Sequence, residues 1–209
     1  MQKVPEFYRM FTGIVESTGQ VAEIEISGTN KTFWIQSPLS HAFTVDQSVA
    51  HDGVCLTVEE VKENRHRVTA IAETLEKSNL GDWRKGSLIN LEQSLQPMKR
   101  LDGHFVQGHV DCVGICEDIT NKDGSYDFVF SFPKQFAPLV IEKGSISLNG
   151  ISLTIFNVTQ TTFTVSIIPY TFEHTNIKQV KKGVAVNLEF DMLGKYILRK
   201  LSLEQTASG

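Results

Sequence analysis

The chain has 209 residues, 41% hydrophobic and 21% charged, which is ordinary for a globular protein of one large or two small domains. A formal net charge of −4 argues against a nucleic-acid partner, because neutralising phosphates needs a concentrated basic surface. No run of about 18 apolar residues is present, so we expect no membrane-spanning helix. Three cysteines at irregular spacing, and a start without the apolar core of a secretory signal, favour the reducing cytoplasm.

The first half of the chain has the pattern of a series of short strands. Segments 12–26, 31–37, 53–61 and 66–72 are rich in Val, Ile, Thr and Phe, and they are bounded by Gly, Asn, Asp or Ser. The stretch 74–79, TLEKSN, follows them as a single helical turn. Five or six short strands in roughly 90 residues predict a small closed antiparallel barrel, which has no exposed strand edge.

The second half and the tail follow the same order. Segments 109–119, 126–132, 150–158 and 163–168 again have strand composition, and TFEHTN at 171–176 resembles a helical turn. The tail DMLGKYILRKLSLE then spaces its apolar side chains like one helical face, with Asp191 as a candidate N-cap. An amphipathic helix that follows two complete barrels needs a surface to pack on, which predicts a contact between subunits.

An internal repeat relates the two halves. The stretch 52–61, DGVCLTVEEV, is nearly rewritten as NGISLTIFNV at 149–158, an offset of 97 positions. The same offset pairs the triplet Asn-Leu-Glu at 90–92 with the same triplet at 187–189. The predicted fold is therefore all-β, with two homologous barrels and a C-terminal helix. The predicted boundaries are an N-terminal extension (1–9), two barrels (10–97 and 98–190) and a helix with its tail (191–209).

The repeated strand carries matched polar side chains. Side chains in a strand alternate between faces, so Val54, Leu56 and Val58 should face the core, and Cys55 and Thr57 should face outward. The second copy repeats this pattern, with Ile151, Leu153 and Ile155 inward, and with Ser152 and Thr154 outward. A solvated polar strand face is the simpler alternative. The match in both halves fits equally well two equivalent sites for two similar small molecules.

Four residues suggest a metal site that the spacing disfavours, namely His104, His109, Cys112 and Cys116. At ~3.3 Å per residue, an extended strand would place His109 and Cys116 about 23 Å apart. Zinc needs all its ligands within about 2.3 Å of one point. We therefore expect no metal and two buried core cysteines, while the histidines stay open as structural hydrogen-bonding groups or as acids and bases.

Several motifs in order resemble riboflavin synthase: MFTGIVE at 10–16, SVAHDGVCLTV at 48–58, ETLEKSNLGDW at 73–83, DGHFVQGHVD at 102–111 and ISLNGISLTI at 146–155. The resemblance spans Met10 to Leu201. It implies a homotrimer of chains with two six-stranded Greek-key barrels and a C-terminal helix. It also implies conversion of two 6,7-dimethyl-8-ribityllumazine molecules into riboflavin and a ribitylamino-pyrimidinedione, by four-carbon transfer without metal or organic cofactor.

The resemblance also implies active sites between the N-terminal barrel of one subunit and the C-terminal barrel of its neighbour, with each copy of the repeated motif holding one substrate. By position, the first pocket would use Gly13, Ile14, Val15, Cys55, Leu56, Thr57, Thr69, Ala70, Ile71, Ala72, Glu73, Thr74, Gly108, His109 and Val110. The second would use Lys143, Ser152, Leu153, Thr154, Ile167, Ile168, Pro169, Tyr170, Thr171 and Phe172. Five residues match family positions implicated in catalysis, namely Phe11, Ser48, His104, His109 and Asp191, and Cys55 and Ser152 are further catalytic candidates.

The chemistry of such a transfer suits these groups. A weakly acidic methyl on the donor must lose a proton, and a nucleophile must add to a ring carbon of the acceptor. Cys55 or a held water could be the nucleophile, and Ser152, His109 and Asp191 could move protons. The assignment of roles stays open. Asp191 as a helix cap and Lys143 as a surface lysine remain the structural alternatives.

Two other functions compete with the enzyme. A non-catalytic flavin- or lumazine-binding relative, such as the antenna proteins of luminous bacteria, would keep the fold but tend to lose polar groups of one pocket. A two-barrel interaction module without a small ligand would leave the matched polar pairs unexplained. The resemblance also leaves open an association with lumazine synthase, the enzyme of the preceding step. Family chains usually begin at the Met of MFTGIV, so residues 1–9 form an extension here.

Overall fold

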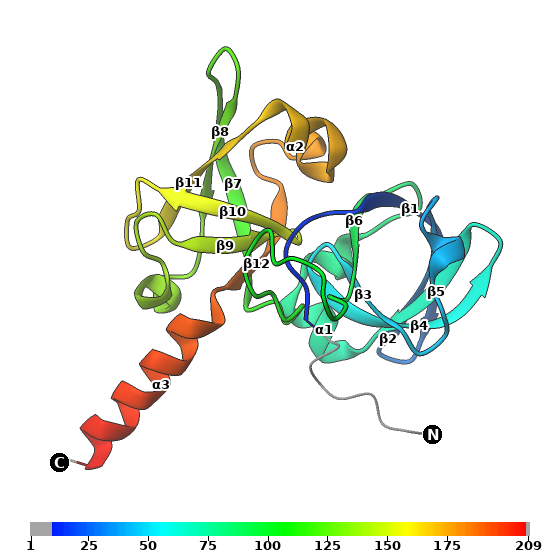
Figure 1. Cartoon of the computed structure of the whole chain (residues 1–209), viewed down its shortest axis with the longest axis horizontal. Helices are drawn as coiled ribbons and strands as arrows, with labels where there is room; N and C mark the ends of the chain where they lie inside the picture. Colours follow the sequence, from blue (N-terminus) through cyan, green and yellow to red (C-terminus); the bar gives the residue numbers. More distant parts are fainter. Residues whose placement is uncertain (1–9, 208–209) are drawn as a thin grey trace.

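The computed structural model describes residues 10–207, and its strands close into two six-stranded antiparallel barrels followed by one long helix (Figure 1). The first barrel contains β1 (Ser17–Ser27), β2 (Asn30–Gln36), η2 (Ser40–Ala42), β3 (Ser48–His51), β4 (Val54–Lys62), β5 (Arg65–Ala70), α1 (Ala72–Lys77), η3 (Asn79–Asp82) and β6 (Leu88–Gln93). The second contains β7 (Cys112–Asn121), β8 (Tyr126–Ser131), η4 (Lys134–Leu139), β9 (Ser145–Leu148), β10 (Ile151–Phe156), β11 (Thr162–Ile167), α2 (Pro169–His174), η5 (Asn176–Gln179) and β12 (Ala185–Phe190). The fold class predicted from the repeat is confirmed, whereas the extension at 1–9 lies outside the described residues.

Both barrels have the same Greek-key topology. The strands of the first follow the order β1-β2-β5-β4-β3-β6, and the second, read around its closed sheet, follows β7-β8-β11-β10-β9-β12. The sequence-based start of the first strand at residue 12 was wrong, because β1 begins at Ser17. Gly13 has a φ of 76°, a left-handed conformation that interrupts an extended strand, and Gly108 repeats it in the other half with a φ of 79°.

The barrel cores confirm the predicted faces of β4 and β10. Val54, Leu56 and Val58 are buried in the first core. In the second barrel Ile151 and Ile155 are buried, and Leu153 is half-buried against the same core. Cys112 and Cys116 are also buried in the second core, as the sequence predicted. The polar side chains Cys55, Thr57, Ser152 and Thr154 are partly or largely exposed on the outer faces.

The repeated turns DG and NG meet each other where the barrels join. Asp52 and Gly53 both have positive φ, as do Asn149 and Gly150, which is the backbone of a type I′ hairpin turn. A Cβ atom on Gly53 would lie 2.7 Å from the backbone nitrogen of Gly150, so the two turns pack against each other with no room for a side chain. The turn glycines are thus required by the contact between barrels as well as by the turn itself.

Asparagines from both halves complete this junction. The Asn90 amide nitrogen donates to the carbonyl of Asn149 (2.8 Å), and that of Asn187 donates to the carbonyl of Asp52 (2.9 Å). Asn176 donates to the carboxylate of Asp52 at 2.8 Å. Burial raises the pKa of Asp52 to about 8, an effect only partly offset by its hydrogen bonds. Because the partners come from opposite halves, these bonds fix the barrels relative to each other.

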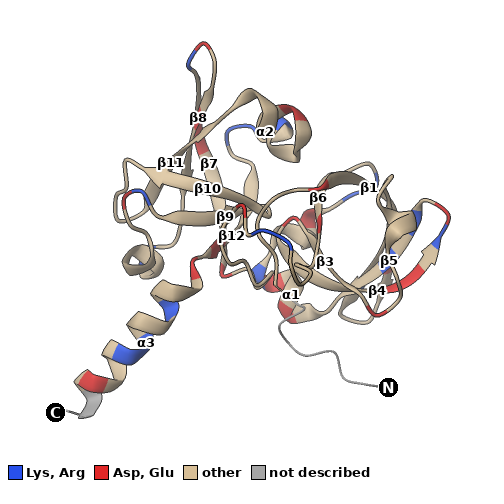
Figure 2. Cartoon of the chain, in the orientation of Figure 1, with Lys and Arg blue, Asp and Glu red and all other residues tan. Residues whose placement is uncertain are grey.

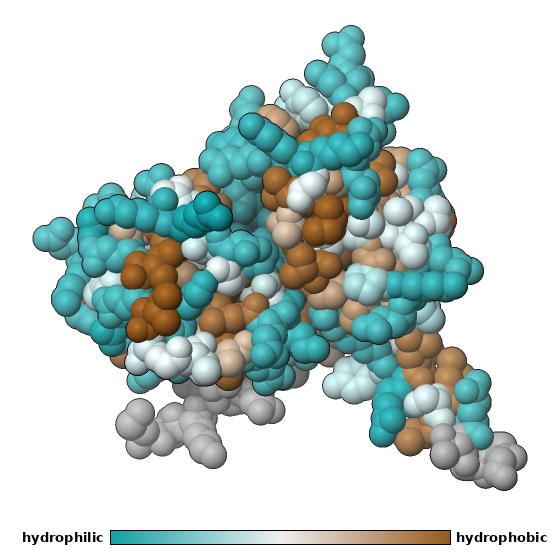
Figure 3. Space-filling model, turned by 180° about the vertical axis from the view of Figure 1, so that it is seen from behind, coloured by the Kyte–Doolittle hydropathy of each residue, from teal (hydrophilic) through white to brown (hydrophobic). Residues whose placement is uncertain are grey.

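The last helix, α3 (Met192–Ala207), extends away from both barrels (Figure 1). Asp191 caps it, since its carboxylate accepts a hydrogen bond from the amide of Leu193 at 3.0 Å, as the sequence predicted. Hydrophobic side chains are exposed on this helix: Leu193, Tyr196, Ile197, Leu201 and Leu203. Figure 3 shows brown, hydrophobic atoms along it. Within residues 10–207, no helix is both long enough and apolar enough to cross a membrane.

Candidate functional site

The second barrel gathers several expected residues around Ser152 on β10. The imidazole Nδ1 of His104 lies 2.7 Å from the Ser152 hydroxyl, and the Ser152 amide donates to the carbonyl of Gly13 at 2.7 Å. Burial lowers the pKa of His104, against the opposing effect of the negative charge of Asp191. A neutral imidazole in hydrogen-bond contact with a hydroxyl can exchange a proton with it. These residues therefore form a site suited to proton transfer.

The first barrel has the equivalent arrangement around Cys55 on β4. The Cys55 amide donates to the carbonyl of Gly108 at 2.9 Å. Phe11 is fully buried and pairs with Val106 in an isolated antiparallel bridge. Together with Ala50 these two residues form a small apolar cluster against which Cys55 packs. His109 is exposed beside this cluster. Here a thiol occupies the place that a hydroxyl occupies in the second barrel.

The segment with Gly13 and Val15, which the sequence analysis assigned to the first pocket, contacts the second barrel. Gly13 lies against Ser152, with only 2.6 Å between a hypothetical Cβ and that of the serine, and Val15 packs on the second core. Gly13 and Val15 therefore lie against the second barrel, whereas Phe11 packs beside Cys55 of the first. Conversely, Gly108 lies against Cys55, and Val110 packs on the first core, where the sequence placed them. The segment before the first barrel thus lies against Ser152 of the second barrel, and the segment before the second barrel lies against Cys55 of the first.

Two buried glutamates hold these crossing segments, and the sequence analysis did not assign them to the site. Glu92 on β6 accepts hydrogen bonds from the amides of Thr12 (2.7 Å) and Gly13 (3.0 Å). Glu189 on β12 accepts from the amides of residues 107–109, at 2.6 to 2.9 Å. Burial raises the pKa of both carboxyls to about 7, an effect opposed by these hydrogen bonds. The repeated Asn-Leu-Glu triplet was the available signal.

The remaining expected residues flank the two strands. Ser48 lies opposite Thr57 in the neighbouring strand β3, so the two side chains share a face with Cys55. Ile71 and Ile168 are exposed at equivalent positions, where β5 and β11 lead into short helices. Ala70 and Ile167 at these strand ends point into the cores. The expected residues at the end of β5 are Thr69, Ala70, Ala72, Glu73 and Thr74, and those at the end of β11 are Ile167, Pro169, Tyr170, Thr171 and Phe172.

Lys143 takes a left-handed conformation before β9, with a φ of 63°, and its ammonium lies 5.3 Å from the ring centre of Phe156. The equivalent residue in the first half, 97 positions earlier, is Asp46, whose φ of 69° is nearly the same. The backbone is thus conserved between the halves while the charge is reversed.

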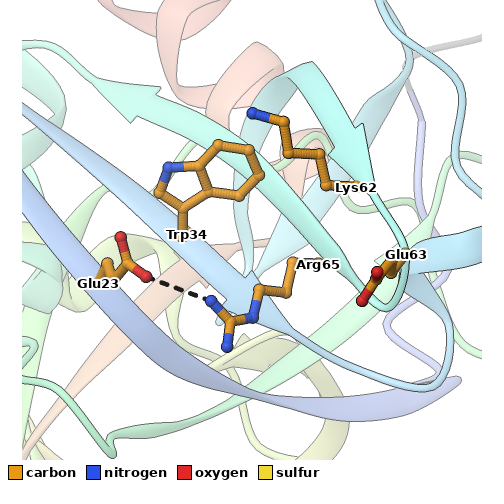
Figure 4. A pocket seen from close by; sticks show the side chains of 5 residues that line it. All are labelled: Glu23, Trp34, Lys62, Glu63 and Arg65. Atoms are coloured by element: carbon orange, nitrogen blue, oxygen red, sulfur yellow. Dashed lines mark hydrogen bonds and ion pairs between the residues drawn. The ribbon is translucent and has the colours of Figure 1, made fainter.

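Surface hollows do not mark the site by themselves. One of about 250 Å³ borders the expected strand end, and Pro169 and Phe172 help to line it. A larger one, of about 710 Å³, lies at the charged β4–β5 hairpin, around Trp34, and contains none of the expected residues (Figures 2 and 4). In this larger hollow the guanidinium of Arg65 lies 3.2 Å from the carboxylate of Glu23, so the two charges compensate each other. Among residues 10–207, no three His, Cys, Asp or Glu side chains are grouped to hold a metal.

Comparison with known proteins identifies close relatives. The model of the lumazine binding domain matches the chain twice, at residues 12–94 and 107–191. A riboflavin synthase of Bacillus subtilis is 36% identical, covering 92% of this chain and 90% of its own length. A riboflavin synthase of Mycobacterium bovis is 40% identical, covering 91% and 97%. The crystal structure of LumP complexed with riboflavin has the same fold, with a TM-score of 0.80 at 19% identity over 86% of this chain and 98% of that one.

Proposed function

The chain belongs to the riboflavin synthase family, and we propose that it catalyses the dismutation of two 6,7-dimethyl-8-ribityllumazine molecules into riboflavin and 5-amino-6-ribitylamino-pyrimidinedione. The enzyme is a transferase of a four-carbon unit and acts in the final step of riboflavin biosynthesis. Identities of 36 to 40% over nine-tenths of the chain carry this conclusion. The presence of a polar strand in both barrels fits a reaction between two identical substrates.

The two pockets would contribute different groups to this reaction. The second-barrel pocket offers the hydroxyl of Ser152 in contact with His104, which can accept a proton from a weakly acidic methyl. The first-barrel pocket offers the thiol of Cys55, with Ser48 and Thr57 on the same face, which can add to a ring carbon or hold a water that does so. Holding two flat rings face to face would supply much of the acceleration, up to about 7–11 kcal/mol.

The direct test is incubation of the protein with 6,7-dimethyl-8-ribityllumazine. Riboflavin absorbance and fluorescence should appear at a rate proportional to the protein concentration. A LumP-like binding protein, the alternative suggested by the shared fold, would bind the lumazine without consuming it. Tight binding without turnover would therefore contradict the proposed function.

We further propose that the active enzyme is a homotrimer in which the pocket of one subunit faces that of its neighbour. The support is the apolar face of α3, where Leu193, Tyr196 and Ile197 are each more than half exposed in the single chain. Burying such side chains between subunits would stabilise the assembly by about 1.5–3 kcal/mol each. Light scattering on a chain ending at Asp191 should show that the trimer is lost, and an unchanged trimer would remove α3 from this role.

Location and further partners are also proposals. None of the three cysteines forms a disulfide, which fits a reducing cytoplasm. Association with lumazine synthase stays a prediction. Co-sedimentation of the two purified enzymes would test it.

A further inference from the structure

Two carboxylates at equivalent repeat positions, Glu92 and Glu189, each bind a segment that closes the pocket of the opposite barrel. We propose that these glutamates are positioning residues that act across the junction, so that Glu92 sets the geometry of the Ser152 pocket and Glu189 that of the Cys55 pocket. The ligand named for these pockets rests on the proposed function, whereas the coupling itself rests on geometry alone.

The first half of the coupling runs from Glu92 to Ser152. One carboxylate oxygen of Glu92 accepts both the amide and the hydroxyl of Thr12, each at 2.7 Å, and the other accepts the Gly13 amide at 3.0 Å. The carbonyls of the same two residues then accept the amides of His104 (3.1 Å) and Ser152 (2.7 Å). Glu92 belongs to the first barrel, while the pocket that it reaches belongs to the second.

The second half runs from Glu189 to Cys55 by the same route. One carboxylate oxygen of Glu189 accepts the Gln107 amide at 2.6 Å, and the other accepts the amides of Gly108 and His109, both at 2.9 Å. The carbonyl of Gly108 then accepts the Cys55 amide at 2.9 Å. Here the carboxylate belongs to the second barrel, and the pocket to the first.

Steric contact on the other side leaves the segments little freedom. A Cβ on Gly13 would lie 2.6 Å from that of Ser152, and one on Gly108 would lie 2.5 Å from that of Cys55. The segments therefore cannot move closer to the strands, and the carboxylates prevent them from moving away. Above pH 7, where the two carboxyls are ionised, hydrogen bonds to the charged acceptor are about twice as strong as neutral ones. The position of each segment thus depends on a residue rooted in the opposite barrel.

The test uses the full-length chain with Glu92→Gln and Glu189→Gln, which keep the side-chain shape. A glutamine replaces one acceptor oxygen with an amide donor, which opposes at least one backbone N–H. Two local probes report on the pockets without any ligand. They are the rate at which iodoacetamide alkylates Cys55 and the NMR shifts of the His104 imidazole. Burial raises the pKa of Cys112 to about 12 and of Cys116 to about 11, so these thiols stay unreactive.

We expect a crossed pattern. Glu189→Gln should raise the alkylation rate of Cys55 about tenfold, because hydrogen bonds to a charged acceptor are lost, and should leave the His104 signals in place. Glu92→Gln should shift the His104 signals and change the alkylation rate far less than Glu189→Gln does, because it reaches Cys55 only through Phe11. Glu16→Gln, which removes a nearby exposed carboxylate that binds neither segment, is the control and should change neither probe.

Two outcomes would overturn the proposal. In the first, each variant would affect the probe in its own barrel, so that Glu92→Gln changes Cys55 alkylation and Glu189→Gln changes the His104 signals. In the second, both variants would affect both probes in proportion to the thermal stability that they lose. If a glutamine variant does not fold, Glu92→Asp and Glu189→Asp, which keep the charge but shorten the reach, should give the same crossed pattern. Turnover is measured separately. A crossed pattern without any turnover would contradict the proposed function while leaving the coupling intact.

Discussion

The two barrels share a topology but fill their interiors in different ways. In the first, His51 and His66 are buried with their Nε2 atoms 2.8 Å apart, and His66 Nδ1 lies 2.8 Å from the Ser40 hydroxyl. In the second, the positions equivalent to the two histidines are Leu148 and Phe163, both fully buried. Hydrogen-bonded polar side chains in the first barrel and buried apolar side chains at the same positions of the second are thus compatible with one strand order.

The second core is instead rich in aromatic rings. The centroids of Phe130 and Phe163 are 5.9 Å apart, and those of Phe136 and Phe190 are 5.1 Å apart. By contrast, the turn glycines and the carboxylates at Glu92 and Glu189 are the same in both halves. The interior of such a barrel can therefore be filled by different sets of well-packed side chains, whereas the junction between the barrels requires matched residues on both sides.

The largest effect should come from separating the barrels. A fragment of residues 10–110 retains Cys55 with Gly108 and Val110, so it should bind riboflavin, but it lacks Ser152 and should not turn over lumazine. Residues 10–97 alone should bind more weakly, because the segment that closes Cys55 is missing. Flavin fluorescence titration and a turnover assay measure both. Turnover by either fragment near the rate of the full chain would show that one barrel suffices.

A second test separates packing at the junction from backbone strain. Gly53→Ala and Gly150→Ala should destabilise the protein strongly, because the added Cβ would lie 2.7 or 2.8 Å from the opposite backbone nitrogen. Gly86→Ala and Gly183→Ala are matched controls with positive φ and open space, and should cost only the strain of about 1–2 kcal/mol. We expect roughly 1–3 kcal/mol more at the junction, read from urea unfolding. Equal costs for the two pairs would mean that the turns do not limit how closely the barrels pack.

Substituting the two polar strand residues tests whether the pockets are functionally equivalent. Ser152→Ala removes the partner of His104 and should lower kcat by about 100-fold. Cys55→Ser keeps a small polar group in the other pocket and should lower kcat less, unless the thiol is the nucleophile. Circular dichroism should stay unchanged, because both side chains point away from the cores. Loss of folding in step with activity would contradict this assignment of faces.

The last test concerns the pH dependence of stability. Burial lowers the pKa of His51 to about 4 and of His66 to about 2, so below pH ~6.5 the unfolded chain binds protons that the folded chain does not. Stability should therefore be fully present above pH ~6.5 and fall on acidification, by up to about 1.4 kcal/mol per pH unit for each histidine.

The matched variant copies the second barrel, with His51→Leu and His66→Phe together. Its unfolding free energy should decline less steeply than that of the unchanged protein between pH 6.5 and pH 4. The raised pKa values of Glu92 and Glu189 give the opposite slope, since their contribution is lost as pH rises towards about 7, but they are common to both proteins. Identical slopes would show that the histidine pair does not titrate on unfolding.

Much of this molecule follows from its sequence alone. The alternation of Val54, Leu56 and Val58 determines which face of β4 is buried, because strand geometry is local. The offset of 97 residues determines that the second half repeats the first. Asp191 caps the last helix through a hydrogen bond to the amide of Leu193, only two residues along the chain. Each of these features depends on neighbours in the chain.

The tertiary structure alone decided which segment closes which barrel. Gly13 and Gly108 stand at equivalent repeat positions with nearly the same φ, so either could have closed its own barrel or the other one. Local patterns cannot separate the two arrangements, because homologous halves present the same local patterns. The choice is made by contacts between residues about 80 positions apart, from Glu92 to Thr12 and from Glu189 to Gly108, which exist only once both barrels have formed.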